Sequence, residues 1–153
     1  MSKTDGLKGS RVMPHEPLPK LLSQLDLFAG LPDNVIADLI AVGVRFDEPP
    51  GATLIAQGST SAGLHVVIEG TAEFEVNGVR RGEVGQGKYF GEISVLDGKG
   101  RSATVLAGKD GLKTFAVSPM NLSALIDKYP SLAKSLMAML CARIRSLEAT
   151  DQE

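Results

Sequence analysis

Glycine and proline divide this chain of 153 residues into three parts. Of its 17 glycines, 13 lie between Gly51 and Gly111, and the stretch from Gly51 to Val117 contains none of the 8 prolines. Glycine permits the tight turns that join short strands, whereas proline is excluded from the interior of a sheet. We therefore expect a strand-rich middle region with frequent turns, and helices before and after it.

Short apolar runs in the middle region alternate with turn residues. The expected strands are Ala52–Gln57, Leu64–Glu69, Thr71–Val76, Val79–Val84, Ala103–Ala107 and Leu112–Val117. From Ala72 to Val76 apolar residues alternate with glutamates, which predicts one face toward a core and one toward water. Asn77-Gly78 predicts a type I′ hairpin turn, and Asp110-Gly111 predicts the same turn between the last two runs. This spacing favours a small closed or double-sheet β structure.

Helical periodicity marks both flanks. Before the strands, leucines at helical spacing and the segment Pro32–Val42 predict two packing helices. After them, Ser118-Pro119 predicts an N-cap with a first-turn proline, and a last helix is expected over Pro130–Glu148. That helix has an apolar surface wider than one stripe, formed by Leu132, Leu136, Met137, Met139, Leu140, Cys141, Ile144 and Leu147. Either it is half sunk in the core, or it meets both the β core and a partner chain.

The residue counts exclude several classes of protein. With 16 Lys and Arg against 18 Asp and Glu, the net charge of −2 disfavours broad electrostatic binding to DNA. No apolar stretch is long enough to span a bilayer, and Met1–Val12 lacks a signal peptide's apolar segment, so we expect a cytoplasmic protein. The single cysteine lies within an apolar helix, and two histidines are too few for the usual Cys/His metal clusters. No base is placed beside a serine, and we expect no metal, no cofactor and no enzyme.

The segment from Gly85 to Val105 has the chemistry of an anion site. Gly91 allows close backbone approach, and a helix start after it would expose free N–H groups, which suit a phosphate. Arg101 offers a two-pronged guanidinium and Ser102 adds a hydroxyl. Glu92 cannot bind an anion, but beside a phosphate it can accept from a sugar hydroxyl, which indicates a ribose phosphate. The alternative is that Glu92 and Arg101 pair with each other across a turn.

The run Phe90-Gly91-Glu92-Ile93-Ser94-Val95-Leu96, continued by Arg101-Ser102-Ala103-Thr104-Val105, resembles the phosphate-binding cassette of the cyclic nucleotide-binding domain family. The resemblance extends from Leu27 to Ile144. It includes Leu27–Leu31, Pro50-Gly51, Gln57-Gly58, Val66–Gly70 and Ala142–Ile144. One departure is Gly100, where many members of the family have proline before the arginine.

This resemblance implies a mainly β fold with flanking helices. It is an eight-stranded β-roll, similar to a double-stranded jelly roll, with N-terminal helices, two C-terminal helices and the nucleotide inside. The implied domain covers residues 18–148, including a C-terminal lid helix, between a flexible segment 1–17 and a tail 149–153. The implied ligand-binding residues are Gly91, Glu92, Ile93, Ser94, Arg101, Ser102, Ala103, Phe74, Val84 and Arg143.

Their roles follow from the same resemblance. Glu92 accepts from the ribose 2′-hydroxyl, the backbone near Gly91 and Ala103 gives amides, and Arg101 with Ser102 holds the cyclic phosphate. Phe74 and Val84 line the sugar and base. Arg143 on the last helix either extends its charge to water or stacks on the base. The ligand is expected to be cAMP, with cGMP as the alternative, because Ser102 does not discriminate between the two bases.

We therefore expect a regulatory sensor in which the last helix moves as a lid and changes a partner surface. Its partners would be the cyclic nucleotide, a second copy through the C-terminal helix and a separate effector protein. A degenerate roll that serves only for dimerisation is the alternative. A DNA-binding regulator of the catabolite activator type would need a helix-turn-helix after the long helix, where only Ala149–Glu153 remain, so direct DNA binding is not expected. A cupin-like metalloenzyme fits poorly with His15 in the tail and His65 alone in its strand.

Overall fold

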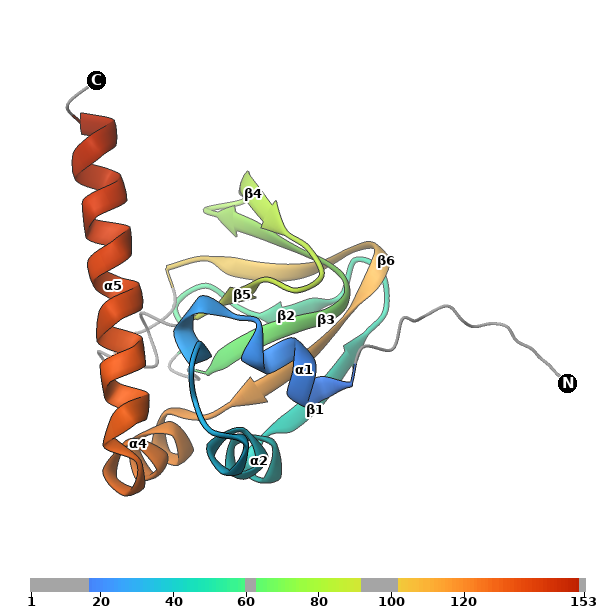
Figure 1. The fold of residues 1–153 in the computed structure, drawn as a ribbon. Coiled ribbons are helices and arrows are strands. Elements are labelled where there is room, and N and C mark those ends of the chain that lie inside the picture. The colour runs from blue at the N-terminus through green and yellow to red at the C-terminus, as the bar shows by residue number, and fades with distance from the viewer. Residues whose placement is uncertain (1–16, 60–62, 92–101, 152–153) are drawn as a thin grey trace, which may run out of the picture.

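The computed structural model describes residues 17–59, 63–91 and 102–151, and within these ranges helices precede and follow a β region along the chain (Figure 1). The N-terminal helices are α1 (Leu18–Ser23), η2 (Asp26–Phe28, a 3₁₀-helix) and α2 (Asp33–Val42), and the C-terminal helices are α4 (Pro119–Lys128) and α5 (Pro130–Asp151). The strands are β1 (Val44–Glu48), β2 (Thr53–Ile55), β3 (Leu64–Val76), β4 (Val79–Val84), β5 (Tyr89–Phe90) and β6 (Thr104–Val117). The predicted arrangement, with helices before and after a strand-rich middle region, is confirmed.

The described strands form one antiparallel sheet of six strands, with the order β1-β6-β3-β4, while β2 pairs with β6 and β5 pairs with β3. The long strands β3 and β6 each contain two of the predicted runs. Strand β1 was not predicted, although Val44 and Phe46 alternate with charged residues there. β1 is an edge strand because it stands at the end of the strand order and pairs with β6, and both of its apolar side chains are exposed.

The predicted hairpin at Asn77-Gly78 is confirmed. Asn77 and Gly78 have φ angles of 52° and 81°, and Val76 pairs with Val79 on either side of the turn. A type I′ turn requires positive φ at both central residues, and asparagine and glycine tolerate this conformation best.

The predicted turn at Asp110-Gly111 is wrong. Residues on both sides of it belong to β6, and both halves of β6 pair with the same strand, β3, in the same direction. The register shifts between Gly70 and Ala72, where Gly70 pairs with Leu112 but Ala72 pairs with Ala107. The positive φ of Gly111, 83°, therefore bends the strand and does not reverse the chain.

The sheet separates two apolar clusters. The first, on the helical side, joins side chains of the N- and C-terminal helices to Leu64, Val66, Phe115 and Val117 of the sheet. The second, inside the bent sheet, contains Ile55, Val67, Ala72, Phe90, Val105, Ala107 and Leu112, with Leu54, Phe74 and Val84 partly buried against it. Because successive side chains in a strand point to opposite faces, Val66 and Val67 belong to different clusters.

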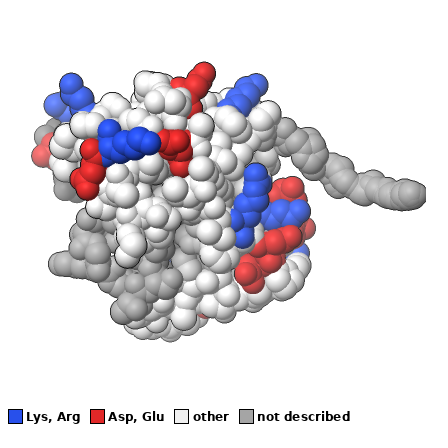
Figure 2. All heavy atoms as spheres, turned by 90° about the horizontal axis from the view of Figure 1, so that it is seen from below, with Lys and Arg blue, Asp and Glu red and all other residues white. Residues whose placement is uncertain are grey.

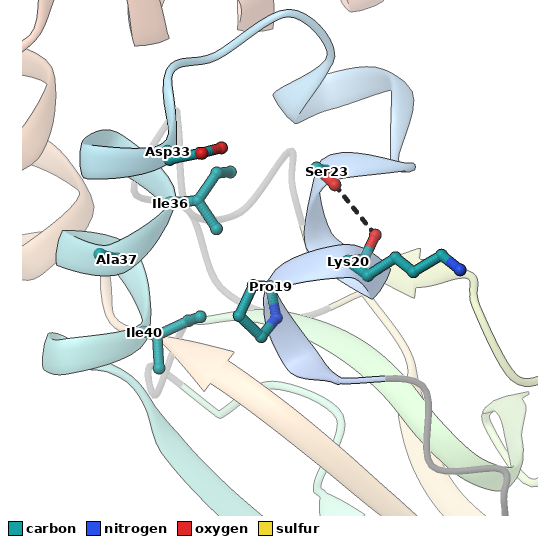
Figure 3. Close-up of a pocket in the computed structure, with 7 residues that line it drawn as sticks. All are labelled: Pro19, Lys20, Ser23, Asp33, Ile36, Ala37 and Ile40. Atoms are coloured by element: carbon teal, nitrogen blue, oxygen red, sulfur yellow. Dashed lines mark hydrogen bonds between the residues drawn. The ribbon is translucent and has the colours of Figure 1, made fainter.

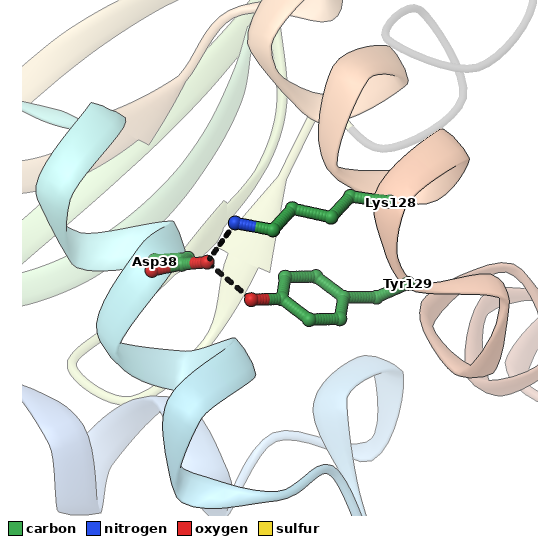
Figure 4. A network of polar contacts seen from close by, with 3 residues as sticks. All are labelled: Asp38, Lys128 and Tyr129. Carbon is green, nitrogen blue, oxygen red and sulfur yellow. Dashed lines mark hydrogen bonds and ion pairs between the residues drawn. The ribbon is translucent and has the colours of Figure 1, made fainter.

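Polar contacts define the start of α4 and hold its end against α2. The hydroxyl of Ser118 accepts from the Asn121 amide at 3.1 Å, which confirms the predicted N-cap of α4. At the other end of α4, the Asp38 carboxylate on α2 accepts from both the Lys128 ammonium group and the Tyr129 hydroxyl (Figure 4). These contacts fix α4 against α2, and the backbone enters α5 directly after Tyr129.

The last helix, α5, begins at Pro130 as predicted and changes its environment along its length. Leu132, Leu136 and Met139 are buried, whereas every residue from Cys141 to Ala149 is exposed. Figure 1 shows the C-terminal end of α5 standing clear of the sheet. The helix is therefore half sunk in the core only along its first part. None of the helices in the described ranges is both long and apolar enough to cross a membrane.

Candidate ligand-binding site

The predicted cassette falls largely outside the described residues. Glu92, Ile93, Ser94 and Arg101 all lie in the range 92–101. The described part contains the two ends of the cassette. Gly91, with φ 88°, follows β5 directly, and Ser102 and Ala103 precede the first residue of β6. Ser102 is exposed, whereas Gly91 and Ala103 are half-buried.

Both ends of the cassette lie beside one aromatic residue, Phe74. The Phe90 ring stacks on His65 with 5.0 Å between centroids and also meets the edge of Phe74 at 5.4 Å. His65 and Phe74 are nine residues apart on β3, which would separate them by about 30 Å in a straight strand. The bend of β3 at Gly70 must therefore bring Phe74 back over Phe90. Because Phe74 also pairs with Val105 of β6, it links the two ends of the cassette.

The two residues predicted to line the sugar and base lie on the inner side of the sheet. Phe74 and Val84 are half-buried and pack against the inner cluster. Val84 pairs with Ala72, and Phe74 lies opposite Gly82, which has no side chain to fill the space across the strand. The structure thus brings Phe74 and Val84 to one apolar surface, next to Phe90.

The start of β6 is fixed by Gln57, which was not among the predicted site residues. The Gln57 amide donates to the Thr104 hydroxyl at 2.9 Å. The Gln57 side chain also accepts from the Asn77 amide at 2.8 Å and donates to the Asn77 side chain at 3.2 Å. These bonds connect the end of β2, the tip of the β3–β4 hairpin and the residue after Ala103. The sequence marked this position only as the end of a predicted strand and as part of the Gln57-Gly58 pair.

His65 is the buried titratable group nearest to the site in the described part of the chain. Its side chain is 6% exposed, and Nδ1 is hydrogen-bonded to the Thr114 hydroxyl at 3.0 Å. The His65 ring also lies 5.4 Å from that of Phe46. Within the described ranges no three His, Cys, Asp or Glu side chains gather in an arrangement able to hold a metal ion.

Arg143 lies over an aromatic ring of this chain. Its guanidinium carbon is 5.6 Å from the centroid of Tyr89, the residue before Phe90. The Tyr89 hydroxyl in turn donates to the Asp26 carboxylate at 2.6 Å. Burial raises the pKa of Tyr89 to about 12, and the bond to Asp26 acts in the same direction. Neither of the two roles left open for Arg143 included this contact, because Arg143 and Tyr89 are far apart in the sequence.

Charged side chains of both signs are mixed on one face of the molecule (Figure 2). On the face seen from below, basic and acidic side chains gather in mixed groups with a wide uncharged area between them (Figure 2). A separate hollow of about 610 Å³ lies between α1 and α2 (Figure 3). It is lined by Pro19, Lys20, Ser23, Asp33, Ile36, Ala37 and Ile40, and it contains none of the predicted site residues.

The chain belongs to the cyclic nucleotide-binding domain family, which matches residues 47–129. Among curated proteins, it is 24% identical over 126 residues to the potassium/sodium hyperpolarization-activated cyclic nucleotide-gated channel 4 of Homo sapiens. That match covers 82% of this chain and 10% of the channel. The chain thus spans about a tenth of the length of this relative.

Solved structures of three other proteins are also similar to this chain. The catabolite activator protein of Thermus thermophilus has a TM-score of 0.72 and 28% identity, covering 84% of this chain and 62% of that chain. The N-terminal domain of a transcriptional regulator from Streptomyces coelicolor A3(2) has a TM-score of 0.75 and 27% identity, covering 85% and 94%. The sensor domain of the regulator DNR from Pseudomonas aeruginosa, at 20% identity, shares the fold, with a TM-score of 0.72 over 85% of this chain and 90% of its own.

Proposed function

We propose that this chain is a non-catalytic sensor that binds a cyclic nucleotide, with cAMP favoured over cGMP, inside the bent sheet. The observation that carries this proposal is the approach of Phe90 to Phe74, which places both described ends of the cassette beside one half-buried aromatic ring. In this proposal the cassette supplies the donors for the phosphate, and the apolar inner side of the sheet supplies the surface for the base. The bends of β3 and β6 would divide each into two of the family's eight strands.

In this proposal the cassette residues keep the roles that the family implies. Arg101 and Ser102 hold the cyclic phosphate, backbone amides near Gly91 and Ala103 complete the anion site, and Glu92 accepts from the ribose, with Ile93 and Ser94 following it. Phe74 and Val84 line the sugar and base. The contacts of Gln57 support this assignment, because they hold the end of the cassette at Thr104 against the hairpin tip.

The proposed output is a movement of α5, which carries an exposed apolar stripe. Met137, Ile144 and Leu147 are 58%, 56% and 67% exposed, and Leu140 is half-buried. The spacing of these four residues, three, four and three, is that of the a and d positions of a coiled coil. We assign this stripe to a second copy of the chain or to a separate effector. Sedimentation of the wild type and of Ile144→Glu tests self-association, which the charge should abolish.

A roll that serves only for dimerisation is the second candidate, and the same stripe favours it. The two functions differ in ligand binding. Isothermal calorimetry and thermal unfolding with cAMP, cGMP and AMP separate them, because ligand at 100 times its Kd stabilises a protein by about 2.7 kcal/mol. A sensor should respond to a cyclic nucleotide and much less to AMP. If none of the three shifts unfolding or gives a heat of binding, the dimerisation function stands and the sensor does not.

A further inference from the structure

The two residues of β5 face opposite sides of the sheet. Phe90 belongs to the inner cluster, where it contacts Phe74, whereas Tyr89 packs against the helical cluster on the other side. Their backbone is held by pairing with His65 and Val66 of β3. Because neighbouring side chains on a strand share one backbone, a shift that moves the backbone at Phe90 also displaces Tyr89.

Tyr89 connects three elements on the helical side. Its hydroxyl donates to Asp26 of η2, and its ring lies under the guanidinium of Arg143 of α5. Further back along the same helix, the Ser135 hydroxyl of α5 donates to the carbonyl oxygen of Ala29 at 3.3 Å. The first part of α5 is therefore fixed to the body by buried leucines and this bond, and Arg143 is a point where its exposed part contacts the sheet.

We infer that Tyr89 is a positioning residue that couples the nucleotide site to the exposed half of α5. A bound nucleotide moves Phe90 and with it the β5 backbone, and Tyr89 transmits this movement to Arg143 and Asp26. This inference rests on the proposed function. A ligand changes a conformational equilibrium only through its different affinity for the two states. Here the two states differ in whether Arg143 lies on the Tyr89 ring, and the position of β5 favours one of them.

The energetic scale suits such a coupling. Residues 141–149 are exposed, so apolar burial contributes little to the position of this half of the helix. A cation–π contact at an accessible site changes an equilibrium constant roughly two- to fivefold. A contact of this strength can bias the position of α5 and still be overcome by a bound nucleotide.

The native cysteine gives a direct report of α5. Cys141 is the only cysteine of the chain, it is exposed, and it lies two residues before Arg143. Two residues span about 200° around a helix, so a nitroxide on Cys141 points away from the Tyr89 contact. Its electron paramagnetic resonance line shape would be recorded on the full chain, without ligand and with saturating cAMP.

Three variants separate the parts of the contact. Tyr89→Leu removes both the ring and the hydroxyl, Tyr89→Phe keeps the ring over which Arg143 lies, and Arg143→Met removes the cation. Tyr129→Leu is the matched control, because Tyr129 also donates to a carboxylate, Asp38, and has Lys128 at 5.2 Å from its ring. Circular dichroism verifies that each variant is folded, and Tyr89→Phe remains available if Tyr89→Leu does not fold.

We expect Tyr89→Leu and Arg143→Met to increase the mobile fraction of the spectrum roughly two- to fivefold without ligand. Both should also reduce the change that cAMP produces. Tyr89→Phe keeps the ring but loses the hydroxyl that donates to Asp26, so it should increase the mobile fraction less than Tyr89→Leu does. Tyr129→Leu should lower the melting temperature without altering the cAMP-dependent change. If the wild type gives no binding heat with any cyclic nucleotide, the proposed function fails. If the wild type binds cAMP but Tyr89→Leu and Arg143→Met respond as it does, the inference alone is overturned.

Discussion

Gly70 and Gly111 lie against each other where β3 and β6 bend, each with a φ of 83°, and a methyl group on Gly70 would overlap the Gly111 carbonyl oxygen. This close backbone approach lets Phe74 return over Phe90. The shape of the proposed nucleotide site thus depends on two residues that contribute no side chain to it.

Gly70→Ala should therefore reduce the free energy of unfolding more than the same substitution at a turn where the added methyl group meets no other atom. Gly78 has nearly the same φ, 81°, but nothing lies within 4 Å of the place that a methyl group would take there, so Gly78→Ala is the matched control. The positive φ costs both variants about 1–2 kcal/mol, and the overlap should add about 1–3 kcal/mol to Gly70→Ala. Urea unfolding measures the difference. Equal losses would show that the strands do not approach closely at Gly70.

The N-cap of α4 should contribute measurably to stability. Ser118→Ala removes the acceptor for the Asn121 amide and should reduce the free energy of unfolding by about 1 kcal/mol. Ser123→Ala, at an exposed position inside the same helix, should be neutral or slightly stabilising, because alanine is the better helix former. A larger loss at Ser123 than at Ser118 would contradict the capping assignment.

The contact between Asp38 and Tyr129 should make the free energy of unfolding depend on pH in the acidic range. The hydrogen bond from Tyr129, followed by that from Lys128, lowers the pKa of Asp38 below its usual 3.8. Because the pKa of Asp38 is lower in the folded state, its charged form stabilises the fold at pH values above the unfolded-state pKa. This stabilisation is lost as the pH falls through the folded-state pKa. Tyr129→Phe should be less stable than the wild type at pH 7, and the difference should shrink below pH 3.8. Asp38→Asn should remove the same part of the acid dependence in urea titrations, and parallel curves for wild type and variants would argue against it.

Tyr89 should ionise at a higher pH than an ordinary tyrosine. The chain has two tyrosines and no tryptophan, so tyrosinate absorbance in Tyr129→Phe reports Tyr89 alone. Burial and the bond to Asp26 raise its pKa from 10.0 to about 12. The stability linked to this shift is present below pH 10 and declines as the pH approaches 12. Asp26→Asn should move the titration to lower pH, and a midpoint near 10 in the folded parent would refute the contact.

Arg101 should carry a large share of nucleotide affinity if the cassette binds a cyclic phosphate. A charged hydrogen bond contributes about 1.5–3 kcal/mol, so Arg101→Ala should weaken cAMP binding roughly 10- to 150-fold. Arg81→Ala, which removes an exposed arginine from β4, should leave the affinity unchanged. Calorimetry compares the two variants. Unchanged affinity in Arg101→Ala would remove this residue from the phosphate site.

Local patterns in the chain were sufficient to predict the Asn77-Gly78 hairpin, the Ser118 cap, the helical flanks and the cassette's family resemblance. Each depends on interactions or motifs within a few residues, where the backbone preferences of asparagine, glycine, serine and proline are strong. The same reasoning failed at Asp110-Gly111. A local turn signal cannot reveal that both halves of β6 pair with one continuous partner strand.

The contacts that organise the site join residues far apart along the chain. Phe74 meets Phe90 because β3 bends, and Tyr89 meets Asp26 across 63 positions and Arg143 across 54. No pattern within a segment specifies such pairs, because they depend on how a bent sheet and its flanking helices pack together. Composition and local motifs were enough to assign the family. The contact of Arg143 with Tyr89 was decided by the packing of α5 against β5.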